Sequence, residues 1–134
     1  MQDKFDMASR SYNRAVRWND LDAAMAYLPS ESQPGFLAER EDADDEIEIV
    51  DYERVRLSLD PGNAQGSVRV IMRWHYDDSI VVETSVVDQV WQFFDGTWVL
   101  VDEWQIKGEP LFLFANREDG ETDVPHPYLS LIHI

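Results

Sequence analysis

The pair Asp95-Gly96 constrains the fold more than any other feature of this sequence. It separates two runs rich in β-branched and aromatic residues within VVDQVWQFFDGTWVLVDEW, residues 86–104. Asp-Gly between such runs is typical of a two-residue type I′ turn, so we predict an antiparallel hairpin. With Phe94 facing Thr97, the predicted opposite pairs are Phe93 and Trp98, Trp91 and Leu100, Val90 and Val101, and Asp88 and Glu103.

Two more strands are predicted before this hairpin. Apolar and polar residues alternate from Ile47 to Leu59, but the alternation changes phase within the run, which is typical of a β-bulge. The turn DPGN, residues 60–63, separates this strand from SVRVIMRWHY, residues 67–76. The hairpin strands themselves are expected over residues 80–94 and 97–106.

The amino-terminal part of the chain predicts helices. Apolar residues recur at spacings of three and four from Asp3 to Trp18, which predicts one amphipathic helix with Phe5, Ala8, Tyr12, Ala15 and Val16 on its buried face. Asn19 is expected to cap a second short helix that ends at Pro29, and a third is expected at residues 36–40.

Together these elements predict an α+β fold. We expect a single domain over residues 1–110, with N-terminal helices packed on a curved, mainly antiparallel four-stranded β-sheet, and a C-terminal extension over residues 111–134.

The predicted register decides which side chains face the helices. A three-residue loop at 77–79 places Arg73 opposite Glu83 and Trp74 opposite Val82. In this register the candidates for lining a pocket under the helices are Val70, Met72, Trp74, Val86, Val90 and Val101. The opposite face then carries an aromatic patch that needs a cover, either the segment PLFLF or a second subunit, and its interface candidates are Trp91, Phe93, Trp98 and Trp104. A homodimer is therefore one of the two predicted covers.

Asp88 and Glu103 are the candidate catalytic residues. Two carboxyl groups directly opposite each other on an apolar face repel and lose hydration, so at least one is expected to keep its proton near neutral pH or to bind a cation. A carboxyl group with a raised pKa inside a cavity suits general acid-base catalysis. The alternatives are that both groups are hydrated at the rim of the sheet, or that a bulge in the third predicted strand, residues 80–94, turns one of them outward. Gln89, opposite Asp102 and near Arg69, is interpreted either as a group that orients a polar ligand or as part of a surface network.

The order of the elements resembles the nuclear transport factor 2-like superfamily, with its cone-shaped, cystatin-like fold. The resemblance covers residues 3–106 and rests on the helical segment WNDLDAAMAYL, an acidic loop, a long kinked strand and a meander that ends in VWQFFDGTWVLVDEW. It implies a cone that in ketosteroid isomerase-like and polyketide cyclase-like members holds acids or histidines against apolar walls. The superfamily also includes dehydratases and domains that only bind or dimerise, so the resemblance implies no particular activity.

The composition and the absence of known motifs argue against several classes of partner and of catalytic chemistry. The chain carries 27 acidic residues against 11 Lys and Arg, a net charge of −16, so nucleic acids and anionic membranes are poor partners. It has no cysteine, no glycine-rich phosphate loop and no GxSxG or HExxH motif, and its acidic run at residues 39–48 lacks the spacing of an EF-hand loop. We predict no metal and no cofactor. The first hypothesis is a non-catalytic domain that binds a small apolar ligand or a protein partner; the alternative is an isomerase-, dehydratase- or cyclase-type enzyme that uses the pocket carboxylates.

The two ends of the sequence leave alternatives open. MQDKFDMASR has no apolar segment typical of an export signal, which favours the cytoplasm by default, whereas a leader upstream of Met1 would make this a periplasmic lipoprotein domain. The final residues LSLIHI are interpreted either as non-native sequence or as a last apolar strand.

Overall fold

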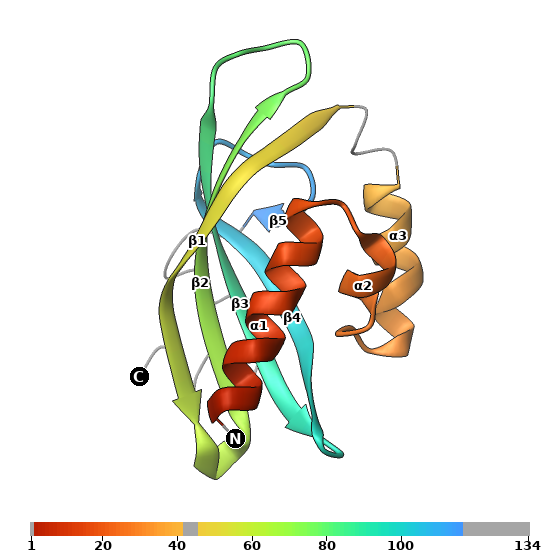
Figure 1. Cartoon of the computed structure of the whole chain (residues 1–134), viewed down its shortest axis with the longest axis vertical. Coiled ribbons are helices and arrows are strands. Elements are labelled where there is room, and N and C mark those ends of the chain that lie inside the picture. Colours follow the sequence, from red (N-terminus) through yellow and green to blue (C-terminus); the bar gives the residue numbers. More distant parts are fainter. Residues whose placement is uncertain (1, 42–45, 117–134) are drawn as a thin grey trace.

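Three α-helices precede a curved antiparallel sheet in the computed structural model, which describes residues 2–41 and 46–116 (Figure 1). The helices are α1 (Gln2–Arg17), α2 (Leu21–Met25) and α3 (Gln33–Arg40), with a short 3₁₀ turn at Ser30–Ser32. The strands are β1 (Ile47–Asp60), β2 (Gln65–Tyr76), β3 (Glu83–Phe94), β4 (Thr97–Gly108) and β5 (Ala115–Asn116). The predicted α+β class, with N-terminal helices on a curved sheet, is confirmed.

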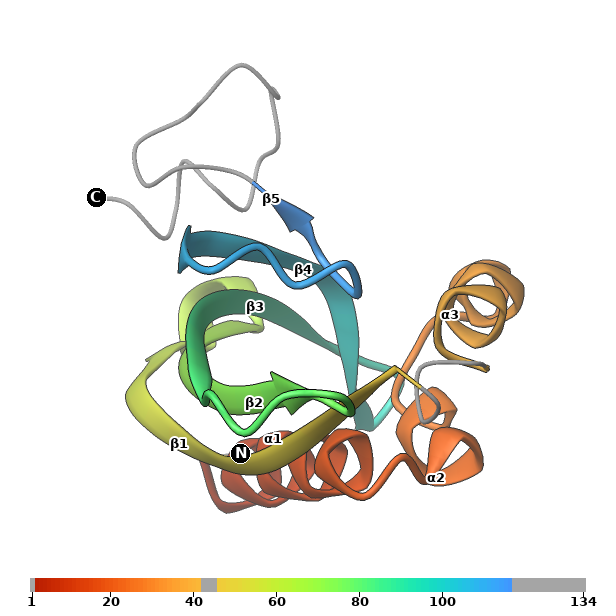
Figure 2. The same ribbon diagram turned by 90° about the horizontal axis from the view of Figure 1, so that it is seen from above.

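The sheet follows the order of the sequence, β1-β2-β3-β4-β5, with antiparallel pairing throughout except that the short β5 runs parallel to β4. Seen from above, the sheet is strongly curved and α3 stands apart from α1 (Figure 2). The expected irregularity of β1 is present as register shifts at Ile49/Asp51 and Arg54/Arg56. Such bulges increase the local twist and bend of a strand, which contributes to this curvature.

Helix α1 packs on the sheet through the predicted apolar face, because Phe5, Ala8, Tyr12, Ala15 and Val16 are all buried. Trp91 of β3 is the centre of the aromatic core beneath it. Its ring lies 5.8 Å from that of Tyr12 and 6.1 Å from that of Tyr27, both edge-on. Phe5 packs 4.8 Å from Trp98. This cluster ties α1 to the β3–β4 hairpin.

The residue that caps α2 differs from the prediction. Asp20, not Asn19, accepts a hydrogen bond from the amide of Ala23 through its side chain. Asn19 instead has a φ of +56°, in the left-handed region that asparagine tolerates better than most residues. It therefore makes the sharp turn between α1 and α2.

The β2–β3 register is displaced by one residue from the prediction. Arg73 lies opposite Thr84 rather than Glu83, and Trp74 lies opposite Glu83 rather than Val82. The strand β3 begins at Glu83, so the connection from β2 is longer than the three residues expected, and Ile80 in this connection is 97% exposed. A displacement of one residue moves every side chain to the other face of a strand.

The β3–β4 hairpin is confirmed near its turn and changes register farther along. Phe94 faces Thr97, Phe93 faces Trp98 and Trp91 faces Leu100, as predicted. Val90 then faces Asp102, which leaves Val101 as the extra residue of a bulge. The predicted pair of Val90 with Val101 is therefore wrong, and so is the pair of Asp88 with Glu103, since Asp88 faces Trp104.

Because the β2–β3 pairing and the far part of the β3–β4 pairing differ from the prediction, several candidate residues lie on the other face of the sheet from the one expected. Val70, Met72 and Trp74 lie in the core under the helices, as predicted, but so do the proposed interface residues Trp91, Phe93 and Trp98. Val86, Val90 and Val101 instead pack with Trp104 and Ile106 in a separate cluster. The prediction that these valines share the helix-covered face with β2 is wrong, because both faces of β3 are apolar and the hydrophobic pattern alone did not distinguish them.

Some predictions fall outside the described residues. Residues 42–45 of the acidic run and the final LSLIHI lie there. Within the described ranges no group of three or more His, Asp or Glu side chains is arranged to hold a metal ion. None of the helices described is long and apolar enough to span a bilayer.

Candidate functional site

Glu103 of β4 is the centre of a polar cluster beneath the helices. Tyr12 of α1 donates its hydroxyl hydrogen to Oε1 of Glu103 at 2.7 Å, and the side-chain amide of Gln89 donates to Oε2 at 2.8 Å. The guanidinium of Arg40, at the end of α3, lies 3.6 Å from Oε1. The bulge at Val101 places Glu103 here, since without it the alternation that starts at Trp98 and Leu100 would turn Glu103 to the opposite face.

Gln89 is held in position by a second buried amide. Asn13 of α1 and Gln89 of β3 exchange two side-chain hydrogen bonds, at 2.9 and 3.2 Å. Asn13 also donates to the carbonyl oxygen of Ser9, and the Trp91 indole lies 3.4 Å from Oε1 of Gln89. Both amides are almost completely buried. Because buried polar groups that are satisfied by one another fix their geometry, this network orients the amide that Gln89 presents to Glu103.

Arg40 is unusual among the arginines that the structure describes, because only 3% of its surface is exposed. Its guanidinium stacks 4.1 Å from the ring of Phe36 and 4.9 Å from that of Phe114. The 3.6 Å to Glu103 is an ion-pair distance but is too long for a good hydrogen bond. Among the described residues, Nε and Nη1 of Arg40 have no hydrogen-bond partner.

The environment changes the acidity of both members of the Tyr12–Glu103 pair. Burial raises the pKa of the Glu103 carboxyl above its ordinary value, against the opposing effects of Arg40, Tyr12 and Gln89. Burial and the negative charge of Glu103 raise the pKa of the Tyr12 hydroxyl well above its ordinary value, so Tyr12 stays protonated. Glu103 is therefore the group of this cluster that can gain or release a proton at moderate pH.

A groove between α3 and β4 reaches this cluster. We call it the α3–β4 groove; its volume is about 310 Å³. Its polar lining includes Glu39, Arg40, Asp102 and Glu103, and its apolar walls are formed by Leu28, Phe36, Leu100, Val101, Leu113 and Phe114. Apolar walls around a few polar groups, one of them with a shifted pKa, are typical of small-molecule sites.

Asp88 does not take part in this site. It lies on the other face of β3, where Arg69 binds it through two hydrogen bonds, Nε to Oδ1 at 2.8 Å and Nη2 to Oδ2 at 3.0 Å. The structure therefore does not bring together the two carboxyl groups that the sequence predicted to face each other. Of the six predicted pocket-lining residues, Val101 is the extra residue of the bulge and lines the groove although it also packs against the cluster around Trp104, whereas Val70, Met72 and Trp74 are part of the packed core.

Four members of the cluster were missed or misread from the sequence. Tyr12 was assigned to the apolar face of α1, Gln89 was given Asp102 and Arg69 as neighbours, and Asn13 and Arg40 were not singled out. A polar residue directly beside the buried stripe of a helix was a signal for Asn13. No comparable signal exists for Arg40, whose burial depends on how α3 packs against Phe114, far along the chain.

The structure is an α+β domain in which α3 and β4 border an open groove with a mixed polar and apolar lining. No protein-family model matches the chain, and no match is found among curated proteins. Among solved structures, the chain is similar to a SEC-C motif containing protein from Rhodopseudomonas palustris, with a TM-score of 0.61 and 16% sequence identity over 75% of this chain and 77% of that one. At this identity the similarity shows a shared fold alone.

Proposed function

We propose that this protein is a non-catalytic, small-ligand-binding domain and that the α3–β4 groove is its site. The observation that carries the proposal is a buried carboxyl group, Glu103, at the floor of a groove with apolar walls. The resemblance to the nuclear transport factor 2-like superfamily, whose members use the space between helices and sheet, supports the same proposal.

The lining indicates the kind of ligand. Glu39, Asp102 and Glu103 outnumber Arg40 in the groove, so an anionic ligand would be repelled. A carboxylate is a hydrogen-bond acceptor with room for more than one donor on each oxygen. We therefore propose a neutral molecule with an apolar ring or chain and one hydroxyl or N–H group that donates to Glu103.

A pair of probes tests this proposal. 4-Ethylphenol has the apolar body and the hydroxyl donor, whereas 4-ethylanisole has the same body with the donor blocked. In amide-shift titrations of the full chain, 4-ethylphenol is expected to give saturable shifts centred on residues 100–103, and 4-ethylanisole to bind about tenfold more weakly, because it forms no hydrogen bond to the carboxylate. Equal binding of both probes, or shifts centred elsewhere, would contradict the proposal.

Gly35 offers a matched pair of variants for the same test. It lines the groove, and a Cβ at this position meets no atom within 4 Å. Gly35→Ala should therefore keep 4-ethylphenol binding, whereas Gly35→Leu should reduce it about tenfold or more by occupying part of the groove. Undiminished binding to folded Gly35→Leu would place the ligand elsewhere.

The second candidate function is an isomerase-, dehydratase- or cyclase-type enzyme that uses one carboxyl group, Glu103, instead of two. The raised pKa of Glu103 and its hydrogen bond to Tyr12 favour it, because a carboxyl group poised in this way can exchange a proton with a bound carbonyl compound. Exchange of the α-hydrogens of cyclohexanone in deuterated water is a direct assay. Catalysis that is lost in Glu103→Gln would favour an isomerase-type enzyme, and exchange at the rate of buffer would favour the binding domain.

A protein partner and a homodimer remain proposals as well. Of the four aromatic residues predicted for a dimer interface, only Trp104 lies on the face away from the helices, and it is 4% exposed. A dimer through this face would therefore use other side chains around Trp104 rather than a free aromatic patch.

A further inference from the structure

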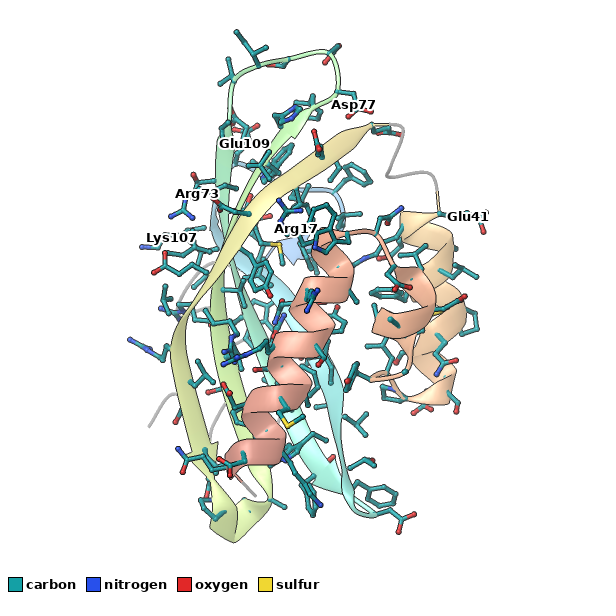
Figure 3. The ribbon with its side chains drawn as sticks, viewed as in Figure 1. Arg17, Glu41, Arg73, Asp77, Lys107 and Glu109 are labelled. Atoms are coloured by element: carbon teal, nitrogen blue, oxygen red, sulfur yellow. The ribbon has the colours of Figure 1, made fainter. Side chains whose placement is uncertain are left out.

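The connection between β2 and β3 carries three consecutive exposed apolar residues, which we call the apolar tip. Ile80, Val81 and Val82 are 97%, 60% and 51% exposed. The connection projects at one end of the long axis of the molecule (Figure 1), and Figure 3 shows Asp77, which directly follows β2, at that end. Single apolar residues are common on protein surfaces, but an uninterrupted run in solvent is unusual unless it serves an interaction.

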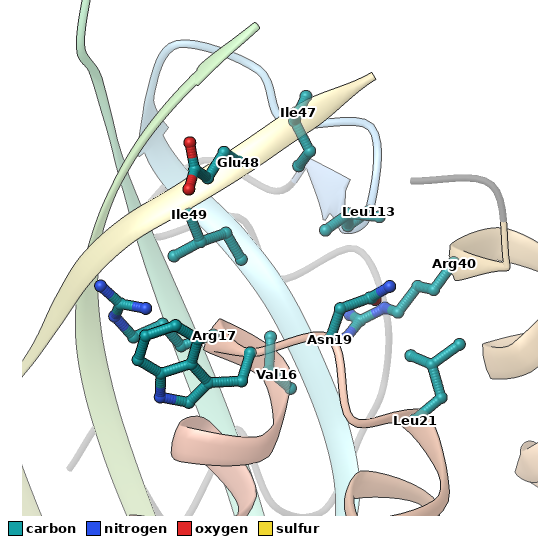
Figure 4. Close-up of a pocket in the computed structure, with 10 residues that line it drawn as sticks. Val16, Arg17, Asn19, Leu21, Arg40, Ile47, Glu48, Ile49 and Leu113 are labelled. Atoms are coloured by element: carbon teal, nitrogen blue, oxygen red, sulfur yellow. The ribbon is translucent and has the colours of Figure 1, made fainter. Parts of the chain in front are cut away.

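The base of this connection is anchored in the fold. Ile47, the first residue of β1, lies opposite Tyr76 and is 5% exposed. The amide of Asp77 donates to the carbonyl oxygen of Glu46. Figure 4 shows the side chain of Ile47 directed into a cavity that Leu113 also lines. The apolar residue at the base of the connection is therefore buried, whereas those of the apolar tip are not.

The backbone of the apolar tip is not part of the sheet. Its residues, 80–82, lie beyond the paired parts of β3, which end at Glu83 toward β2 and at Ser85 toward β4. Within the described ranges no backbone–backbone hydrogen bond involves them. The amide of Val81 donates to the hydroxyl of Ser79 at 3.1 Å. The other backbone groups of the apolar tip are available to another strand, and such an edge is a ready template for strand pairing.

An antiparallel pair of two apolar tips fits these observations. With Val81 opposite Val81 of the partner subunit, Ile80 lies opposite Val82 of the partner subunit, so β-branched apolar residues face one another. Alternate residues of a strand direct their backbone groups to the same edge, so Ile80 and Val82 would supply the hydrogen bonds across this pair. Val81 would take the non-hydrogen-bonded position, in keeping with the bond of its amide to Ser79.

The charges beside the apolar tip favour this pairing over a parallel one. Asp78 and Glu83 flank the tip. In the antiparallel register Asp78 lies opposite Thr84 and Glu83 lies opposite Ser79, so neither acid faces another acid. In a parallel, in-register pair each acid would face its own copy, which is destabilising. Lys and Pro, which commonly protect an exposed strand from pairing, are absent from SIVV, residues 79–82.

We propose that residues 79–83 extend β3 and pair antiparallel with the same residues of a second copy, which gives a weak symmetric dimer. The contact is small, as in other transient complexes, and each copy carries a net charge of −16. Because salt screens the repulsion between the two copies, the dimer should be stronger at high ionic strength. This interface involves neither the α3–β4 groove nor the face around Trp104, so it does not depend on the proposed ligand site.

Sedimentation equilibrium and NMR of the full chain test this proposal. The dissociation constant is expected to be on the order of 1 mM in about 500 mM NaCl and several times weaker in about 20 mM NaCl. Amide shifts that depend on protein concentration should centre on residues 79–83. A mixture of isotope-labelled and unlabelled chain should show contacts between Ile80 of one copy and Val82 of the other, whose side chains lie about 5 Å apart in the proposed pair.

Three variants test the assignment. Ile80→Ser removes an apolar residue from both ends of the symmetric pair and should weaken self-association about tenfold. Phe94→Ser is the matched control, because Phe94 is 70% exposed at the other end of β3 and should leave self-association unchanged. Val82→Pro removes an amide that the pair requires and should also weaken self-association, although a proline directly before a strand is compatible with folding.

The outcomes separate this proposal from its alternatives. Self-association that is weakened by Ile80→Ser and Val82→Pro but not by Phe94→Ser supports it. A chain that stays monomeric at about 1 mM in high salt, shifts centred elsewhere, or equal effects of Ile80→Ser and Phe94→Ser would each overturn it. A monomeric chain that binds phosphatidylcholine vesicles through the apolar tip would overturn it in favour of a lipid surface. Binding of 4-ethylphenol should be the same in Ile80→Ser, so either proposal can fail without the other.

Discussion

Glu103 and Asp88 lie on neighbouring strands but on opposite faces of the sheet. Their hydrogen-bond partners and burial therefore differ. Asp88 is bound on both oxygens by Arg69, the geometry of a strong charge-assisted pair. Glu103 also accepts two hydrogen bonds, from Tyr12 and Gln89, but its ion-pair partner is 3.6 Å away and burial dominates its acidity. A single extra residue in β4, Val101, produces this difference.

Replacing Glu103 with Gln should change how stability depends on pH. The folded pKa of Glu103 lies above its ordinary value of 4.5, so between these two values the folded protein holds a proton that the unfolded chain has released. The free energy of unfolding therefore falls as pH rises through this window. Below the window Glu103 is protonated in both the folded and the unfolded state, so it does not lower the stability there. Relative to the unmodified protein, Glu103→Gln should become progressively more stable from about pH 4.5 upward.

Urea denaturation of both proteins across this pH range measures the effect. The difference in unfolding free energy between them is the relevant quantity, because the titration of the other acids cancels in it. Glu109→Gln, which removes a carboxyl group from an exposed residue, is the control for charge loss. A difference that stays constant with pH, or that increasingly favours the unmodified protein as pH rises, is incompatible with a raised pKa for Glu103.

The packing of helix α1 on the sheet depends on a close contact between Phe5 of α1 and Gly66 of β2. Gly66 lies directly under Phe5, and a Cβ at Gly66 would lie 2.5 Å from the Phe5 ring, which is too close for any real contact. Phe5 is itself fixed between Trp91 and Trp98. The absence of a side chain at Gly66 therefore lets α1 approach the sheet.

Gly66→Ala should lower the free energy of unfolding by about 2 kcal/mol, the usual cost of overpacking a core. Gly35→Ala is the matched control, because the same change in α3 meets no atom within 4 Å and should raise stability by about 0.5–1 kcal/mol through helix propensity. Chemical denaturation of the two variants checks both signs. Equal effects of the two substitutions would mean that α1 does not pack on Gly66.

The helices and strands were largely predictable from the sequence, but which side chains of β3 and β4 face the helices was not. Helical spacing identified α1 and its buried residues, and Asp95-Gly96 identified the hairpin and its first three pairs. The face of β3 depends on the length of the β2–β3 connection, and residues Ile80, Val81 and Val82 gave that loop the composition of a strand. Because β3 is apolar on both faces, no local pattern corrected the one-residue error.

In the whole molecule, the two faces of the sheet carry different kinds of polar interaction. The outer face holds ion pairs such as Arg69 with Asp88, and Arg73 with Asp51 and Glu53. The helix-covered face holds a buried network of Tyr12, Asn13, Gln89 and Glu103 that ends at Arg40. The candidate site could not be predicted from sequence because it joins residues of α1, α3, β3 and β4 through a register that depends on the length of the β2–β3 connection and on the bulge at Val101.

The most direct test of this account is a pH titration of the side-chain carboxyl carbons by NMR, recorded with and without 4-ethylphenol. We predict that Glu103 titrates above 4.5 and that 4-ethylphenol shifts its titration while leaving the Asp88 resonance unchanged, because Glu103 lines the groove whereas Asp88 lies on the other face of the sheet. A Glu103 pKa at or below 4.5, together with no response to the probe, would contradict the account.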